Sequence, residues 1–237
     1  WQEELVGSNP LQIEPELLGS TTEAVTPSER TATEKFAIEF FDGLVRARGE
    51  DGILDEVEKK NLLLKTVRAF TAQNETKLLT RADILATNDA SSEALRAYAN
   101  AMGRAVTDNS PKITLPNEAV ILKRAVDADD PTLLKDLTLI HDAYSGVVKD
   151  MADIRVPESV TTEHLIIVNS FVAIRDDIAA MQRVFEDSLI TYIRMKRYED
   201  DVRGLAKGIA RMRIALEKRD LVFDRGEGGS FFYILKQ

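Results

Sequence analysis

Residues 133–154, LLKDLTLIHDAYSGVVKDMADI, decide the fold class, because apolar side chains recur in them at alternating spacings of four and three. The same alternation returns within residues 167–185 and 198–216. Each apolar stripe therefore stays on one face of an α-helix and needs another helix to cover it. The apolar positions are Leu133, Leu137, Ile140, Tyr144, Val147, Met151 and Ile154, then Ile167, Phe171, Ile174, Ile178, Met181 and Phe185, and finally Tyr198, Val202, Leu205, Ile209, Met212 and Leu216. The pattern predicts an all-α, elongated helical bundle.

The composition agrees with this fold class and narrows the function. With 237 residues, of which 44% are hydrophobic and 6% aromatic, the chain can bury a substantial core. A net charge of −9 argues against nucleic acid as a partner, because phosphate binding needs a basic face. The absence of cysteine removes disulfides, thiolate metal sites and thiol catalysis. No apolar run approaches the roughly 18 to 20 residues of a membrane span.

The N-terminal half is predicted to contain three helices after an acidic linker or arm at residues 1–25. A capping box at Thr26–Glu29 starts the first helix, which is expected to run to Arg48 and to bury Phe36, Phe40, Phe41 and Leu44. The second helix spans residues 53–73. Its expected inward residues are Leu54, Val57, Leu63, Leu64, Val67 and Phe70. Residues 78–87 form either a short helical turn or an extended connector.

A helix from Ser91 to about Val106 should bury Leu95, Tyr98 and Met102, and residues 107–116, with two prolines, are interpreted as a hinge. A short helix follows at 117–127, and Asp130 with Pro131 starts the first striped helix. Residues 155–157 end that helix. Between the second and third stripes we expect a turn near Asp187 or Ser188. The alternative is one continuous helix of about 60 residues, roughly 90 Å long.

The predicted organisation therefore has four parts: the arm at 1–25, an N-terminal helical subdomain at 26–110, a C-terminal bundle at 117–222 and a glycine-rich apolar tail at 223–237. Two apolar runs flank the glycines of the tail, a pattern compatible with a small β-hairpin. The second run contains Phe231, Phe232 and Tyr233, which are candidates for intersubunit contacts.

The last long helix is a basic strip on an acidic protein. Residues 193–220 contain nine basic and five acidic side chains, whereas residues 1–28 contain five glutamates and no basic residue. Such a strip is either an exposed face paired with acidic neighbours or a docking surface for an acidic partner or an anionic envelope surface. Gly204 and Gly208 would allow another backbone to approach, at an internal helix crossing or at a dimer seam. The basic interaction candidates are Arg194, Arg197, Arg203, Lys207 and Arg211.

No motif predicts a catalytic, cofactor-binding or metal-binding residue. We interpret His141 and His164 as boundary residues with ordinary hydrogen bonds, since they would lie roughly 10 Å apart along the bundle. Asp127–Asp130 lacks the glycine and glutamate of a calcium loop and is better explained by helix capping. The carboxylate pairs Asp150 with Asp153 and Asp176 with Asp177 are interpreted as solvated faces. The tail glycines are not followed by the Gly-Lys-Ser/Thr of a phosphate loop.

Several strings resemble an uncharacterised family of secreted or membrane-anchored helical proteins from bacteria of very small genomes. The strings are Ala82–Ile84, Ala94–Gly103, Tyr144–Asp150 and Val156–Ser159, followed by His164-Leu165 and Asn169. The resemblance covers about residues 29–200, and its motifs concern helix packing and turns. It implies an extracytoplasmic location, with a signal or anchor expected upstream of Trp1, and assigns no activity.

The leading hypothesis is a non-enzymatic structural or interaction component of an extracytoplasmic cell-envelope assembly, such as a surface filament, pilus or secretion apparatus. Its partners would be proteins, including copies of itself. One alternative is a helical ligand-binding or sensor module that holds a small molecule between the two halves near residues 107–116. A further alternative is a metal-dependent enzyme, which needs carboxylates and a histidine that converge inside the bundle.

Overall fold

The computed structural model describes residues 30–48 and 54–236. The fold described below is that of the unit Thr31–Gln237. Its described part is mostly helical, which confirms the all-α prediction. The helices are α1 (Ala32–Ala47), α2 (Glu56–Gln73), α3 (Ser92–Asn109), α4 (Glu118–Ala128), α5 (Lys135–Ala152), α6 (Thr161–Met181) and α7 (Ser188–Glu217). Short 3-10 turns are η2 (Arg81–Asp83), η3 (Pro131–Leu134), η4 (Glu158–Val160) and η5 (Gly228–Lys236), and the strands are β1 (Leu85–Thr87) and β2 (Arg155–Pro157).

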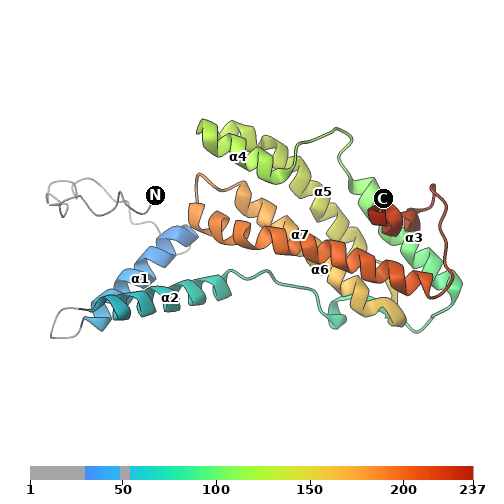
Figure 1. The fold of residues 1–237 in the computed structure, drawn as a ribbon, viewed down its shortest axis with the longest axis horizontal. Helices are drawn as coiled ribbons and strands as arrows, with labels where there is room; N and C mark the ends of the chain where they lie inside the picture. Colours follow the sequence, from blue (N-terminus) through green and yellow to red (C-terminus); the bar gives the residue numbers. More distant parts are fainter. Residues whose placement is uncertain (1–29, 49–53, 237) are drawn as a thin grey trace. The chain divides into compact units, whose positions relative to one another are not determined.

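Helix α6 is the centre of the bundle and lies between α5 and α7 (Figure 1). Within α6 its stripe is buried, as are most of the stripe on α5 and the C-terminal half of the stripe on α7. Three stripe positions, Leu133, Phe185 and Val202, are each about two-fifths exposed. The three stripes therefore cover one another, as a 4-3 pattern requires.

Two breaks shape the bundle. Helix α6 ends at Met181 and α7 begins at Ser188, so the expected turn is confirmed and a continuous 60-residue helix is excluded. Between α5 and α6 the chain extends into β2, which pairs in parallel with β1 in the register Ala86 with Val156. Residues 78–87 thus contain both of the structures that the sequence left open, the helical turn η2 and an extended strand.

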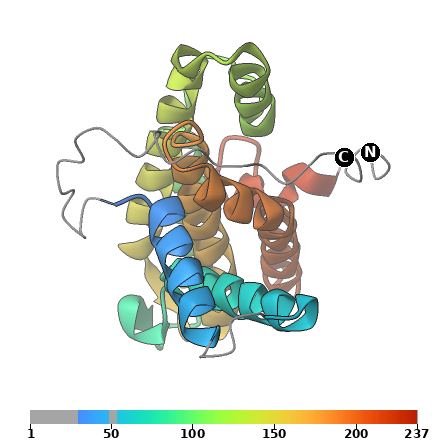
Figure 2. The ribbon, with the colours of Figure 1, turned by 90° about the vertical axis from the view of Figure 1, so that its left-hand side faces the viewer.

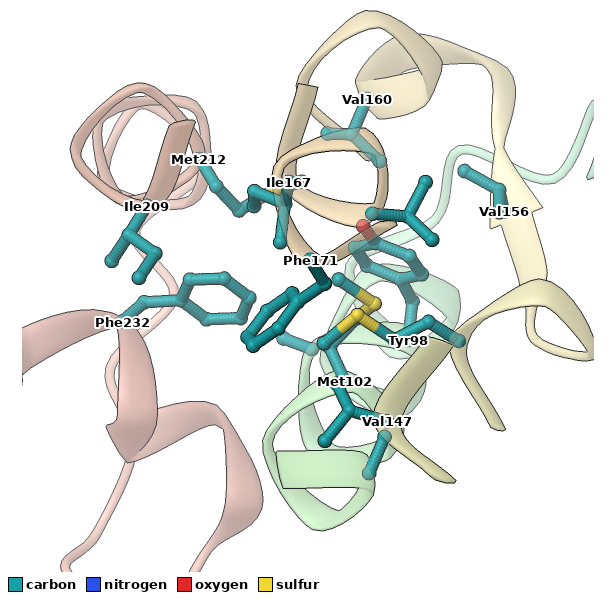
Figure 3. Packing of buried hydrophobic residues seen from close by; sticks show 14 of the residues in the cluster. Tyr98, Met102, Val147, Val156, Val160, Ile167, Phe171, Ile209, Met212 and Phe232 are labelled. Atoms are coloured by element: carbon teal, nitrogen blue, oxygen red, sulfur yellow. The ribbon is translucent and has the colours of Figure 1, made fainter. Parts of the chain in front are cut away.

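The buried side chains form two hydrophobic clusters. The larger gathers residues from α3, α5, α6, α7 and η5, among them Tyr98, Met102, Ile167, Met212 and Phe232 (Figure 3). The smaller joins α4 and the first half of α5 to the second half of α6. The predictions that Leu95, Tyr98 and Met102 are buried on α3 are confirmed, although this helix continues past Val106 to Asn109.

Helices α1 and α2 form an antiparallel hairpin in which several burial predictions are wrong. Figures 1 and 2 show the two helices side by side. Phe36 packs edge-on against Phe70 with ring centroids 5.6 Å apart, but no residue of α1 is fully buried. Phe41 is 63% exposed and Val57 is 65% exposed. Two helices alone have too few neighbours to cover all of their apolar positions.

The first helix begins later than predicted. Thr31 is its N-cap, and Thr31 with Glu34 forms the capping box. The capping box expected at Thr26–Glu29, like the arm at residues 1–25, lies outside the described residues.

The tail is a 3-10 helix, so the predicted β-hairpin is wrong. Phe232 is fully buried in the larger cluster, and Tyr233 donates a hydrogen bond to the carbonyl of Leu221 at 3.0 Å. A Cβ on Gly103 of α3 would lie 1.7 Å from the carbonyl oxygen of Gly228, so the tail backbone packs directly on α3. This close packing on a helix replaces the strand pairing that the sequence suggested.

In the described chain, no helix has the length and apolar character needed to cross a membrane.

Candidate functional site

The basic strip on α7 is divided between the interior and the surface. Arg194 is only 8% exposed, and its guanidinium donates to the carbonyl of Asn74 at 2.6 Å and to the hydroxyl of Thr76. This residue fixes the chain that follows α2 and is not offered to a partner. Arg197 is half-buried, whereas Lys207 is exposed.

The exposed arginines of the strip have acidic neighbours. Arg203 forms hydrogen bonds with Glu199 and with Asp200, one turn earlier on the same helix. Arg211 approaches Glu163 of α6 at 3.4 Å. Exposed pairs of this kind contribute at most about 1 kcal/mol to stability. Arg203 and Arg211 therefore follow the first of the two interpretations of the strip, an exposed face paired with acidic neighbours.

The glycines of α7 face α6. A Cβ on Gly208 would lie 2.9 Å from Cγ2 of Ile166 and 3.0 Å from Cγ1 of Ile167, so this glycine allows the two helices to cross closely. A Cβ on Gly204 would meet only the hydroxyl of Ser170, at an ordinary 3.4 Å. Gly208 thus serves an internal crossing, the first of the two roles considered for the pair.

The aromatic residues of the tail belong to the core and its edge. Phe232 is buried in the larger cluster, and Phe231 and Tyr233 pack partly buried against that cluster. Glu227 holds the preceding turn, since it accepts hydrogen bonds from Arg96 and Asn100 of α3. Backbone and side-chain hydrogen bonds, the one from Asp224 first, lower the pKa of Glu227 to about 2. Phe232 is consequently unavailable for intersubunit contact.

The outward sides of α1 and α2 form a surface with exposed apolar side chains on each helix. On α1 the exposed residues follow a spacing of three and four, and on α2 they follow a spacing of seven and three. We call this surface the hairpin face. It consists of Ile38, Phe41, Val45, Val57, Leu64 and Val67, exposed by 36% to 70%, with Leu63 at its edge. These exposed apolar side chains are candidates for burial by a partner, because removing apolar surface from water is favourable.

A hollow extends from this surface toward the tip of the hairpin. Its volume is about 570 Å³, and it is bounded mainly by apolar side chains with two basic ones at the rim. The lining residues are Phe40, Phe41, Leu44, Val45, Arg48, Leu54 and Lys59.

Asp187 anchors the start of the hairpin to the bundle. Its buried carboxylate accepts hydrogen bonds from the backbone N–H of Ala32 at 2.6 Å and of Thr33 at 3.1 Å, and from the hydroxyl of Thr33 at 2.6 Å. Asp187 occupies the N-cap position of α7, but its side chain makes no capping bond there. It instead satisfies the free N–H groups and the dipole of α1.

Arg194 anchors the chain directly after α2, at the same end of the hairpin as Asp187, and sits next to an acidic pair. Its guanidinium lies 3.8 Å from the carboxyl of Asp177, which is fully buried. Burial, followed by the charge of Asp201, raises the pKa of Asp177 to about 8, while Arg194 and Arg197 act in the opposite direction. The raised pKa favours the protonated form of this carboxyl. The prediction that Asp177 belongs to a solvated face is wrong.

His164 is a core residue and not a boundary residue. It is fully buried, and its Nδ1 lies 3.2 Å from the hydroxyl of Tyr98. Burial lowers the pKa of His164 to about 4, so the ring is neutral at pH 7. His141 lies partly exposed on α5 with its Nδ1 3.5 Å from Asp142. Among the described residues, no three histidine or carboxylate side chains converge as metal ligands.

A hollow of about 490 Å³ lies beside Tyr98, between α3 and the two strands. Its lining includes Ala94, Ala97, Asp153 and Arg155 but no residue of the 107–116 segment, where the ligand-binding hypothesis expected a cavity.

The resemblance strings have packing roles in the structure. Asn169 donates to and accepts from the backbone of Leu79, at 2.9 and 2.8 Å, and so attaches the segment before β1 to α6. A Cβ on Gly146 would lie 2.0 Å from the side-chain oxygen of Asn109, which shows how closely α5 approaches α3.

Searches against models of known protein families, curated proteins and solved structures find no match for the chain.

Sequence reasoning missed the hairpin face and the buried carboxyl, although each had a signal. Helix α1 carries apolar residues on two sides, more than a single partner helix can cover. Residues 164–181 contain only three charged side chains, Arg175, Asp176 and Asp177, which is typical of a central helix buried on most sides. Asp177 also lies one turn from Ala173 and from Ala180, both of which are buried.

Proposed function

We propose that this protein is a non-enzymatic interaction component of a larger assembly and that it contacts its partner through the hairpin face. The observation that carries the proposal is the exposed apolar stripe on each of two neighbouring helices, including Phe41 and Val45. Leaving these side chains in water forgoes roughly 25 cal/mol per Å² of apolar surface, so a partner that covers them gains a driving force.

The anchors support this proposal because they hold the hairpin at one end. Asp187 binds the first turn of α1, and Arg194 binds Asn74 directly after α2. The described hydrogen bonds between the hairpin and the bundle lie at this end, leaving the hairpin face open along its length. A helix pair that is already folded before it binds loses little conformational entropy when a partner covers it.

We further propose that the assembly belongs to the cell envelope and lies outside the cytoplasm, as a surface filament, pilus or secretion apparatus would. The support is the resemblance to secreted or anchored helical proteins and the acidic segment 1–25, rich in Ser, Thr and Pro, which suits a tether. Fractionation of cells that express the complete protein tests this location. Recovery in the envelope or medium is expected, and recovery wholly in the cytosolic fraction would overturn it.

The interaction itself is tested by the size of the native complex in gently prepared cell extract. The wild-type chain should elute as a complex larger than its own mass, and the double variant Phe41→Asp/Val45→Asp should elute as the free chain. A matched control is Ile113→Asp/Val222→Asp, because these residues are 59% and 74% exposed and lie outside the hairpin. If the hairpin variant retains the wild-type complex, or the wild type forms none, the proposal is wrong.

A further inference from the structure

A buried carboxyl lies beside the side chain that attaches the hairpin of α1 and α2 to the bundle. Asp177 of α6 is inaccessible to solvent, and Nη1 of Arg194 lies 3.8 Å from its Oδ1. We propose that Asp177 and Arg194 form a proton-controlled latch, in which a charged Asp177 draws Arg194 away from the chain after α2 and loosens the hairpin. This inference goes beyond the proposed function, because it concerns how the hairpin is held and not what covers it.

Arg194 is a polar link between the end of α2 and the bundle. Its Nη2 donates to the carbonyl of Asn74 at 2.6 Å, and its Nη1 donates to the hydroxyl of Thr76. The side-chain amide of Asn74 donates back to Phe70 within α2, so it adds no bond to the bundle. Loss of the guanidinium would therefore free this end of α2, while Asp187 would still hold the start of α1.

The carboxyl of Asp177 lacks the hydrogen-bond donors that a buried carboxylate needs. Neither of its oxygens accepts a hydrogen bond from a described donor, and one oxygen of Asp201 is also buried without one. The neighbouring Asp176, by contrast, accepts a hydrogen bond from Arg175 at 2.7 Å. An unbonded buried carboxylate is costly, and 3.8 Å from Arg194 exceeds the usual limit of about 3.2 Å. This geometry corresponds to a closed latch with a neutral Asp177.

The charged groups that act on Asp177 from a neighbouring element belong to α7. Asp201 opposes the ionisation of Asp177, whereas Arg194 and Arg197 favour it. Toward α5, the same level of α6 belongs to the smaller hydrophobic cluster. A negative charge on Asp177 would consequently have a guanidinium of α7 as its compensating group.

The direction of the switch follows from this arrangement. Burial, followed by the charge of Asp201, raises the pKa of Asp177 to about 8. Below that pH the neutral carboxyl leaves Arg194 to the chain after α2, and the latch is closed. Above it the carboxylate competes for the guanidinium, since hydrogen bonds between two charged partners are about twice as strong as those between neutral ones. The bonds from Arg194 to Asn74 and Thr76 then weaken, and the latch opens.

The latch is tested by distance measurements between the hairpin and the bundle, using pulsed electron paramagnetic resonance. The chain has no native cysteine, so spin labels can be attached at Lys65→Cys on α2 and Lys149→Cys on α5, both exposed positions. The distance distribution of the otherwise wild-type chain should be narrow at pH 6 and broad at pH 9, on either side of the pKa of Asp177. With Asp177→Asn it should stay narrow at both pH values, because the amide does not ionise. A wild type that stays narrow at pH 9, or an Asp177→Asn chain that broadens equally, overturns the inference.

Two further variants distinguish the latch from a general loosening at high pH. Arg194→Gln removes the guanidinium and should give a broad distribution at both pH values. Asp201→Asn removes a charge that opposes the ionisation of Asp177, so the midpoint of the broadening should move to lower pH. Far-UV circular dichroism checks that each variant retains the wild-type helix content. A folded Arg194→Gln chain with a narrow distribution at pH 6, or an unchanged midpoint in Asp201→Asn, disproves the latch. The proposed function is decided separately, by the native complex of Phe41→Asp/Val45→Asp in extract.

Discussion

The bundle of α3–α7 and the hairpin of α1 and α2 use the same kind of apolar spacing with opposite results. On α6 the stripe is buried, since Ile167, Ile174 and Ile178 are inaccessible to solvent. On α1 a comparable spacing leaves Phe41 and Val45 mostly in water. The difference lies in the number of neighbouring helices, because α6 has α5 and α7 beside it and each hairpin helix has mainly the other. Apolar periodicity thus specifies a helix and its need for partners, but it does not specify whether the partner is in the same chain.

The largest expected difference in stability is between the alanine variants of two phenylalanines, one in the bundle and one on the hairpin. Phe232→Ala removes a fully buried ring and should lower the free energy of unfolding by about 3–5 kcal/mol. Phe41→Ala truncates an exposed ring and should change the stability of the monomer by less than about 0.5 kcal/mol. Urea denaturation at a protein concentration that keeps the chain monomeric measures both. Equal losses would show that the hairpin face is covered within one chain.

The packing of the tail on the bundle is tested at Gly103. An alanine Cβ there would overlap the carbonyl oxygen of Gly228, so Gly103→Ala should cost about 1–3 kcal/mol despite the higher helix propensity of alanine. Gly226→Ala is the control, because nothing lies within 4 Å of its added methyl group. Hydrogen exchange should accelerate in residues 228–236 of the first variant only. Unchanged protection there would contradict the close contact between α3 and the tail.

As the pH falls, the bundle of α3–α7 should lose stability at a higher pH than the hairpin of α1 and α2. His164 has a pKa of about 4 in the folded state, against an ordinary value of 6.5, so the unfolded chain binds an extra proton between these values. Stability from this residue is complete above pH 6.5 and should fall by about 2 kcal/mol between pH 7 and pH 5. The buried residues of α2, Thr66 and Phe70, do not titrate.

The contribution of Asp177 to stability depends on pH in the opposite direction. Its carboxyl must therefore be replaced before the contribution of His164 can be measured alone. Its folded pKa of about 8 lies above the ordinary 3.8, so the stability that it contributes at low pH is lost as the pH rises from about 4 to 8. Asp177→Asn should abolish that loss, since the amide resembles the protonated carboxyl. In this background, urea midpoints at pH 7 and pH 5 should show the decline due to His164. A midpoint that does not fall would contradict a neutral, buried imidazole.

The smallest expected effect concerns the anchor of the hairpin. Asp187→Ala removes the acceptor of three hydrogen bonds to Ala32 and Thr33 and should destabilise the start of α1 by about 0.5–2 kcal/mol. Hydrogen exchange should accelerate in α1 while α6 remains protected. Asp200→Ala on the exposed side of α7 is the matched control. Equal acceleration in both helices would show that the hairpin and the bundle unfold as one unit.

The sequence determined the secondary structure because capping and periodicity are local. Ser91 and Asn117 cap α3 and α4 as their positions predicted, and Pro157 separates α5 from α6. The three stripes were sufficient to predict an all-helical bundle. Local signals failed at the tail, where two apolar runs around glycines suggested strands. The contact of Gly228 with Gly103 joins residues far apart in the chain and has no local signature.

Only the tertiary structure decided which apolar and charged residues are accessible, since burial depends on neighbours that periodicity does not count. It placed Arg194 and Asp187 at the base of the hairpin and enclosed Asp177 beside Asp201. It also left the hairpin face open, although apolar residues recur along α1 and α2. The need for a partner was thus encoded in the residues, and the place where that need remains unmet became visible only when the helices had been packed together.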